Sequence, residues 1–179
     1  MSTFVAQHTK NMLESIITSK TRLRLLIKFF INAANHGYLR GLATEMHENT
    51  NSIRKELNNL SQAGYLLKKE DGVRVTYQAN QAHPLFNLLQ KIVRKYVGLD
   101  TIVEQIVSRT GQVKRVFLIG DYAQGIDSGL IEVVLEGEQI DVDYLVQLVQ
   151  KVEDEIGKKV KVQTTEAFDQ DGLLIFEQV

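Results

Sequence analysis

The chain has 179 residues, of which 44% are hydrophobic and 24% charged, with a formal net charge of -1 at pH 7 and no cysteine. The lack of cysteine excludes disulfides, thiolate zinc sites and cysteine nucleophiles, and no apolar run approaches the roughly 20 residues that a membrane span needs. Because the first residues also lack the charged and then apolar layout of a signal peptide, we expect a cytoplasmic protein with no membrane partner.

The small net charge conceals two halves of opposite charge. Residues 1–98 contain 14 Lys and Arg against 6 Asp and Glu, a balance of +8, whereas residues 99–179 contain 7 against 16, a balance of -9. This split indicates that the first half faces a polyanion and the second does not, unless the charges cluster by chance on solvated surfaces.

Two helical segments come first in the chain. After Ser19, a suitable N-cap, apolar residues at helical spacing predict a core helix with Leu23, Leu26, Ile27 and Phe30 on its inner face. Residues 35–37 break this helix, and a short second helix is predicted over residues 39–46. Its inner face carries Leu39, Leu42, Ala43 and Met46.

A third helix follows after a polar link of residues 47–49. Asn49 or Thr50 can cap it, and Gly64 occupies the position where a glycine commonly ends a helix. Its inward stripe consists of Ile53, Leu57, Leu60 and Ala63. Two short helices with so short a polar link, the second with a polar outer face, are typical of a helix-turn-helix.

A β-hairpin is predicted next. Two strand-like runs flank Asp71 and Gly72, a pair suited to a tight turn because both central positions can adopt positive φ, and cations flank its tip. The order of helices and hairpin predicts a winged helix-turn-helix domain, with three helices and a β-hairpin wing, over residues 1–82.

The outer face of the third helix has the chemistry needed to read DNA bases. Arg54 could bind guanine through two hydrogen bonds and Asn51 or Asn58 could bind adenine, each worth roughly 1–3 kcal/mol of discrimination. Lys55 and the hairpin cations suit phosphates. The predicted DNA-binding residues are Thr50, Asn51, Ser52, Arg54, Lys55, Asn58, Lys68, Lys69 and Arg74. The alternative is a solvated helix face in a domain that binds protein.

The run SIRKELNNLSQAGYLLKKEDGVRVTYQAN resembles the recognition helix, glycine and wing of ArsR-like winged-helix regulators, and the resemblance covers residues 19–98. It implies a sequence-specific transcriptional regulator that binds double-stranded DNA. Metal-sensing members of that family use cysteines. The four histidines, His8, His36, His47 and His83, share no close ligand spacing, so we expect no metal site and no cofactor.

Residues 83–98 predict a linker helix that opens with Pro84, the only proline of the chain. Its apolar face is broad and consists of Leu85, Leu88, Leu89, Ile92, Val93 and Tyr96. This face can pack on its own domain, bridge to a second domain or pair with a second copy. Because helix-turn-helix proteins often bind paired half-sites, we expect a homodimer.

An α/β domain is predicted over residues 99–179, which makes the chain an α+β protein of two domains. Its helices run through Ile102, Ile106 and Val107 and over residues 141–157. Its strands cover residues 113–119, 130–136, 158–164 and 172–178.

The segment FLIGDYAQGIDSGLIEVVLEG resembles the nucleotidyltransferase-like fold in the positions of Gly120, Ala123, Gly125 and Ser128, which implies a mixed sheet. Asp121 stands where that family has serine, and its two metal-binding aspartates would fall on Leu130 and Glu132. Nucleotidyl transfer needs a divalent metal held by clustered carboxylates, and leucine cannot bind one. The resemblance therefore implies a catalytically inactive domain, with Glu132 as a metal ligand only if the domain is active.

Three interpretations of this domain stay open. It could bind a nucleotide or small-molecule effector through a loop with Gly120, Asp121, Gly125 and Ser128, although acidic surroundings disfavour an anion. It could be a structural or oligomerising unit. It could also be a divergent metal-dependent nucleotidyltransferase that uses the winged helix to present its substrate. The sequence as a whole predicts a DNA-binding transcriptional regulator and not an enzyme.

Overall fold

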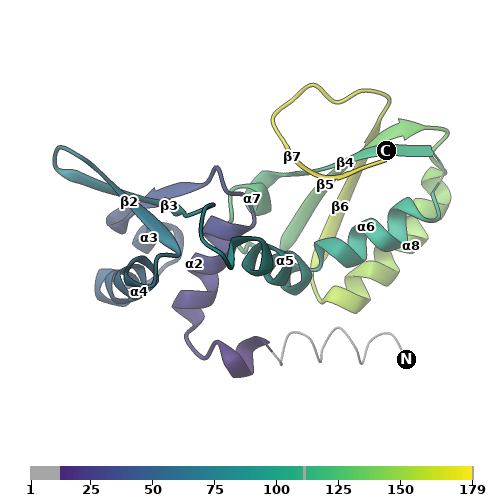
Figure 1. Ribbon diagram of the computed structural model, residues 1–179. Helices are drawn as coiled ribbons and strands as arrows, with labels where there is room; N and C mark the ends of the chain where they lie inside the picture. The colour runs from purple at the N-terminus through teal and green to yellow at the C-terminus, as the bar shows by residue number, and fades with distance from the viewer. Residues whose placement is uncertain (1–12, 111, 179) are drawn as a thin grey trace. The chain divides into compact units, whose positions relative to one another are not determined.

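Figure 1 shows the computed structural model of the chain, which describes residues 13–110 and 112–178. The chain is a mixed α+β protein with two compact units. The first unit consists of Glu14–Val93 together with Gln124–Ile126, and the second is built mainly from Arg94–Ala123 and Asp127–Val179. Each unit has its own sheet and its own buried apolar residues.

The first unit combines helices with a three-stranded antiparallel sheet. In chain order its elements are α2 (Lys20–Phe30), β1 (His36–Tyr38), α3 (Leu39–Glu45), α4 (Thr50–Gln62), β2 (Leu66–Asp71) and β3 (Arg74–Ala79). The strand order is β1-β3-β2, and Figure 1 shows the β2–β3 hairpin extending away from the helices. The three predicted helices and the hairpin are confirmed.

Local capping explains where two of these helices begin and end. The Ser19 side chain accepts a hydrogen bond from the Arg22 N–H at 3.1 Å, and the Asn49 side chain accepts one from the Ser52 N–H at 2.8 Å. These caps satisfy backbone donors that the first helical turn leaves without partners. Gly64 follows the end of α4 with a φ of +80°, a conformation that glycine adopts without steric cost.

The apolar stripes of the three helices form the core of the first unit. The buried members are Leu23, Leu26, Ile27, Phe30, Leu42, Ala43, Met46, Ile53, Leu57 and Leu60. Leu39 is only half-buried and Ala63 is exposed, so the prediction that Ala63 faces inward is wrong. The reason is that α4 ends at Gln62, which leaves Ala63 as the C-cap on the surface.

Strand β1 was not expected from the sequence. It pairs antiparallel with β3, with Gly37 opposite Tyr77 and Tyr38 opposite Thr76. Its three residues are too few to show an alternating pattern, so only the partner strand 40 residues away defines it. The strand lies where the sequence predicted nothing but a helix breaker.

The hairpin turn lies one residue later than predicted. Asp71 and Arg74 form the last register pair, so Gly72 and Val73 are the central residues. Only Gly72 has positive φ, at +59°. This is the pattern of a type II′ turn, which requires glycine at the first central position alone, rather than of the type I′ turn expected from Asp71 and Gly72.

Helix α5 (Phe86–Val97) carries the chain out of the first unit, whose last residue in this stretch is Val93. The helix begins after Pro84 rather than at it. Its predicted apolar face is divided. Val93 is 2% exposed, whereas three residues at helical spacing are exposed to 42%, 56% and 43%, namely Leu85, Leu88 and Ile92.

The second unit has a mixed four-stranded sheet. Its elements are α6 (Leu99–Val107), β4 (Gln112–Ile119), α7 (Gly120–Ala123), β5 (Leu130–Glu138), α8 (Val142–Ile156), β6 (Lys159–Thr165) and β7 (Leu173–Glu177). The strand order is β6-β5-β4-β7, with β5 and β6 parallel and the other pairs antiparallel. Helices α6 and α8 lie side by side (Figure 1). The predicted elements and the mixed sheet are confirmed, and no helix of the described residues could cross a membrane.

Candidate nucleic-acid interface

Three ion pairs join α2 to the segments that follow it. In each pair a cation of α2 binds a carboxylate, and these carboxylates belong to α3, to α4 and to the link between these two helices. Each of α3 and α4 has a single acidic residue, and both take part. The pairs are Arg22–Glu56 at 2.8 Å, Lys28–Glu45 at 2.9 Å and Arg24–Glu48 at 3.1 Å. The three carboxylates thus lie against cations of α2, and the outer face of α4 carries no carboxylate.

Glu56 is the most buried of these carboxylates, with 6% of the residue exposed. It accepts hydrogen bonds from the Ser19 hydroxyl and from Nε of Arg22, both at 2.8 Å. Burial by itself raises the pKa of Glu56, but these two hydrogen bonds and the charge of Arg22 outweigh it, so the pKa lies below its ordinary value. Sequence reasoning missed this residue, although a charged side chain next to the inward Leu57 was a usable signal.

The predicted reading residues of α4 lie on its accessible side. Thr50, Asn51, Arg54 and Lys55 are exposed, whereas Ser52 and Asn58 are half-buried. The structure brings two of them together, because Nη1 of Arg54 donates a hydrogen bond to Oδ1 of Asn51 at 3.2 Å. This bond leaves the other Arg54 donors and the Asn51 amide N–H groups available to a partner.

The hairpin divides the predicted cations between its two faces. Lys68 lies opposite Tyr77 in the register, with its Nζ 5.8 Å from the centre of the Tyr77 ring. Burial raises the pKa of Tyr77, while the charge of Arg54 opposes that rise. Lys68 therefore lies on the same face of the hairpin as Tyr77.

The other face of the hairpin carries Lys69 and Arg74. Lys69 lies opposite Thr76, which shares its face with Arg74 because side chains two apart in a strand point the same way. The Arg74 guanidinium lies over the ring of Tyr38, 5.7 Å from its centre. The three hairpin cations, which the sequence treated as one group, thus occupy two surfaces.

The predicted ligand loop is held closed by its own side chains. Tyr122 is fully buried, and its hydroxyl donates a hydrogen bond to the Asp127 carboxylate and accepts one from the Gly129 N–H at 3.3 Å. Burial, followed by the bond to Asp127, raises the pKa of Tyr122 far above its ordinary range. Asp121 and Ser128 are exposed. Gly125 belongs to the first unit, whereas the other three predicted residues belong to the second.

Glu132, the carboxylate that the sequence resemblance names as a possible metal ligand, is paired with a cation of the same sheet. Its Oε1 accepts a hydrogen bond from Nζ of Lys161 at 3.0 Å, and the two residues are register partners on β5 and β6. Gly120 packs against the same carboxylate, and a Cβ at that position would collide with it. Among residues 13–110 and 112–178, no three His, Asp or Glu side chains gather in a way that could hold a metal ion.

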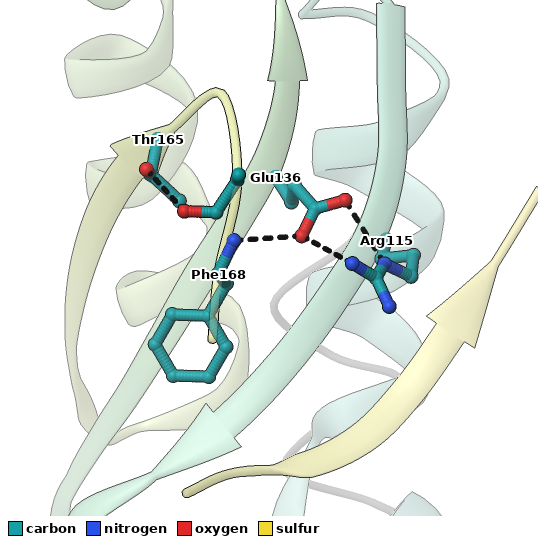
Figure 2. Close-up of polar contacts among 5 residues, drawn as sticks. Arg115, Glu136, Thr165 and Phe168 are labelled. Carbon is teal, nitrogen blue, oxygen red and sulfur yellow. Dashed lines mark hydrogen bonds and ion pairs between the residues drawn. The ribbon is translucent and has the colours of Figure 1, made fainter. Parts of the chain in front are cut away.

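A second buried carboxylate organises the sheet of the second unit (Figure 2). Glu136 accepts hydrogen bonds from Nε and Nη2 of Arg115, at 2.9 and 2.7 Å, and from the Phe168 N–H at 2.9 Å. These bonds hold the pKa of Glu136 below its ordinary range. The Phe168 ring lies 4.7 Å from that of Phe117, so one carboxylate and one ring contact attach the β6–β7 connection to the sheet.

Comparison of the chain with protein-family models, with curated proteins and with solved structures gives no match.

Proposed function

We propose that the chain is a cytoplasmic, homodimeric transcriptional regulator that binds double-stranded DNA sequence-specifically and is not an enzyme. In this proposal the first unit is a winged helix-turn-helix, with α4 as the recognition helix and the β2–β3 hairpin as the wing. The second unit is a catalytically inactive nucleotidyltransferase-like domain that binds a ligand or supports oligomerisation.

The main support is the distribution of charge over α4 and the hairpin. Arg54 and Lys55 are exposed on a helix whose single carboxylate, Glu56, is bound to Arg22 on the opposite side. Within the described residues, neither of them nor any of Lys68, Lys69 and Arg74 forms an ion pair. Cations that the protein leaves unneutralised are what phosphate binding requires, because binding releases the counterions of the duplex.

The chemistry of the α4 surface adds the capacity to distinguish bases. Asn51 and Arg54 present both donors and acceptors near the N-terminal end of the helix, where recognition helices contact base edges. Their mutual hydrogen bond orders both side chains before DNA arrives. Ordered side chains lose less conformational entropy on binding, which favours affinity.

The lack of catalysis in the second unit is supported by the Lys161–Glu132 pair. An ammonium group already neutralises the carboxylate that a metal ion would need, and Leu130 replaces the second one. Two-metal or one-metal phosphoryl chemistry requires carboxylates that are free to bind the ion. The order α6, β4, α7, β5, α8, β6 with parallel β5 and β6 supports the nucleotidyltransferase-like topology.

A homodimer is supported by an exposed apolar stripe that begins at Leu85 and continues on α5. Leu85, Leu88 and Ile92 follow one another at helical spacing and are each more than 40% exposed. Apolar side chains in such a stripe are stabilised when a second apolar surface covers them.

The test begins with selection of duplexes from a random library, followed by fluorescence anisotropy at several salt concentrations. The wild-type chain should bind a preferred duplex with an affinity that falls steeply with salt, and Arg54→Ala combined with Lys55→Ala should abolish this binding. The matched control combines Arg109→Ala with Lys151→Ala, which removes the same charge from the second unit and should leave binding intact. Absence of salt-sensitive binding to any duplex would refute the proposal.

A further inference from the structure

One side chain that the sequence did not single out lies against Arg74, a predicted DNA contact. Tyr38, the last residue of β1, is 48% exposed, and its ring lies beneath the Arg74 guanidinium at 5.7 Å. This distance is within the range of a cation–π interaction. Arg74 is the first residue after the hairpin turn.

The sheet register explains why these two side chains meet. Tyr38 lies opposite Thr76, and Arg74 is two residues away from Thr76 on the same strand. Side chains two apart in a strand share a face, so Arg74 and Tyr38 are diagonal neighbours across β1 and β3. Without the pairing of β1 with β3, Tyr38 would not lie beside Arg74, and the guanidinium would have no aromatic ring to contact.

A glycine of α3 also lies against the ring. A Cβ at Gly41 would lie 2.9 Å from Cζ of Tyr38, closer than real Cβ contacts, and 3.1 Å from Cε1, which is tight. The ring therefore lies against Gly41, where there is no side chain to displace it. The three residues Gly41, Tyr38 and Arg74 link α3 to the hairpin, and we call them the Tyr38 stack.

We propose that Tyr38 is a positioning residue for DNA binding, which holds Arg74 ready for a phosphate of the duplex backbone. The guanidinium stays accessible, because Arg74 is exposed and lines with Tyr38 an open cavity of about 520 Å³. An arginine that is already ordered on an aromatic face loses less freedom when it binds a phosphate. The role of Tyr38 rests on the proposed DNA binding, but it concerns one contact only.

The experiment measures affinity and salt dependence for the selected duplex with the full-length chain. Arg74→Ala should lower the slope of log affinity against log salt by about one, because one phosphate contact is lost. Tyr38→Ala should weaken binding about two- to fivefold, the range of an exposed cation–π interaction, and move the slope towards that of Arg74→Ala. Tyr38→Phe retains the ring and should bind as the wild type does.

Gly41→Ala separates positioning from simple loss of a side chain. It keeps both Tyr38 and Arg74, but the added methyl group displaces the Tyr38 ring from its position against Gly41. It should therefore weaken DNA binding as much as Tyr38→Ala does. Alanine favours a helix more than glycine does, which makes unfolding an unsuitable explanation for the loss. Thr44→Ala, at an exposed position of α3, is the matched control and should leave binding unchanged. In an Arg74→Ala background, neither Tyr38→Ala nor Gly41→Ala should weaken binding further.

The outcomes distinguish the two proposals. If Arg74→Ala weakens binding while Tyr38→Ala and Gly41→Ala bind as the wild type does, the role of Tyr38 is refuted and the proposed function stands. The same conclusion follows if the tyrosine and arginine substitutions weaken binding additively, or if Arg74→Ala itself has no effect. If the wild-type chain binds no duplex, both proposals are refuted.

Discussion

The carboxylate of Glu56 should contribute a large share of the stability of the first unit. Glu56→Ala removes hydrogen bonds from Ser19 and from Arg22, which tie α4 to the start of α2. A hydrogen bond to a charged group contributes about 1.5–3 kcal/mol. Because the Arg22 side chain is 41% exposed, its share falls towards the roughly 0–1 kcal/mol of a surface ion pair. We expect the free energy of unfolding to fall by about 2–3 kcal/mol.

Urea unfolding of the full-length chain, followed by circular dichroism, measures this loss. The control is Glu48→Ala, which breaks the pair with Arg24, whose side chain is 45% exposed, and should cost at most about 1 kcal/mol. Glu56→Gln keeps the side-chain volume and one acceptor but removes the charge. Its loss of unfolding free energy should therefore lie between those of Glu56→Ala and Glu48→Ala. A Glu56→Ala variant that loses no more stability than Glu48→Ala would contradict the assignment.

The stabilisation by Glu56 should also depend on pH. Its pKa is lower in the folded chain than its ordinary value, so the folded state favours the ionised form. The contribution is therefore complete above the ordinary pKa of a glutamate and is lost as the pH falls through the lowered value. The stability difference between the wild type and Glu56→Gln should shrink between pH 7 and about pH 3. A difference that stays constant over this interval would show that the ionised carboxylate is not its source.

Two further predictions concern the second unit. Glu136→Gln should lower the unfolding midpoint of this unit much more than Glu138→Gln, because Glu138 and its partner are both more than half exposed. The effect of Glu136→Gln should diminish as the pH falls below the ordinary pKa of a glutamate and through the lowered pKa of Glu136. Equal midpoints in a thermal scan would contradict this. Tyr122→Phe should lower the free energy of unfolding by about 1 kcal/mol, because it removes the hydroxyl that is hydrogen-bonded to Asp127. Tyr144→Phe, on the surface of α8, should change the free energy of unfolding little. Greater urea sensitivity of the Tyr144→Phe variant would count against the closed loop.

The helices and their ends could be predicted because their causes are local. Ser19 and Asn49 cap the backbone three residues ahead, and Gly64 ends a helix by its own conformational freedom. Most of the inward stripes of α2, α3 and α4 were equally readable, since residues three and four apart share a face whatever they pack against, and Ala63 failed because it lies past the end of its helix. The strands and helices of the second unit followed from the same periodicities.

The sequence by itself thus determined the helices, the hairpin, the strands and helices of the second half and the separation of basic from acidic residues. Tertiary structure decided the features that depend on distant partners. Strand β1 exists because β3 pairs with it, Glu56 is bound by residues 34 and 37 positions away, and the register moved the hairpin turn to Gly72. It also placed Arg74 on Tyr38 and Lys161 on Glu132, pairs joined across strands. Periodicity and capping act within one or two turns of chain, whereas such contacts form only when the sheet register brings separate segments together.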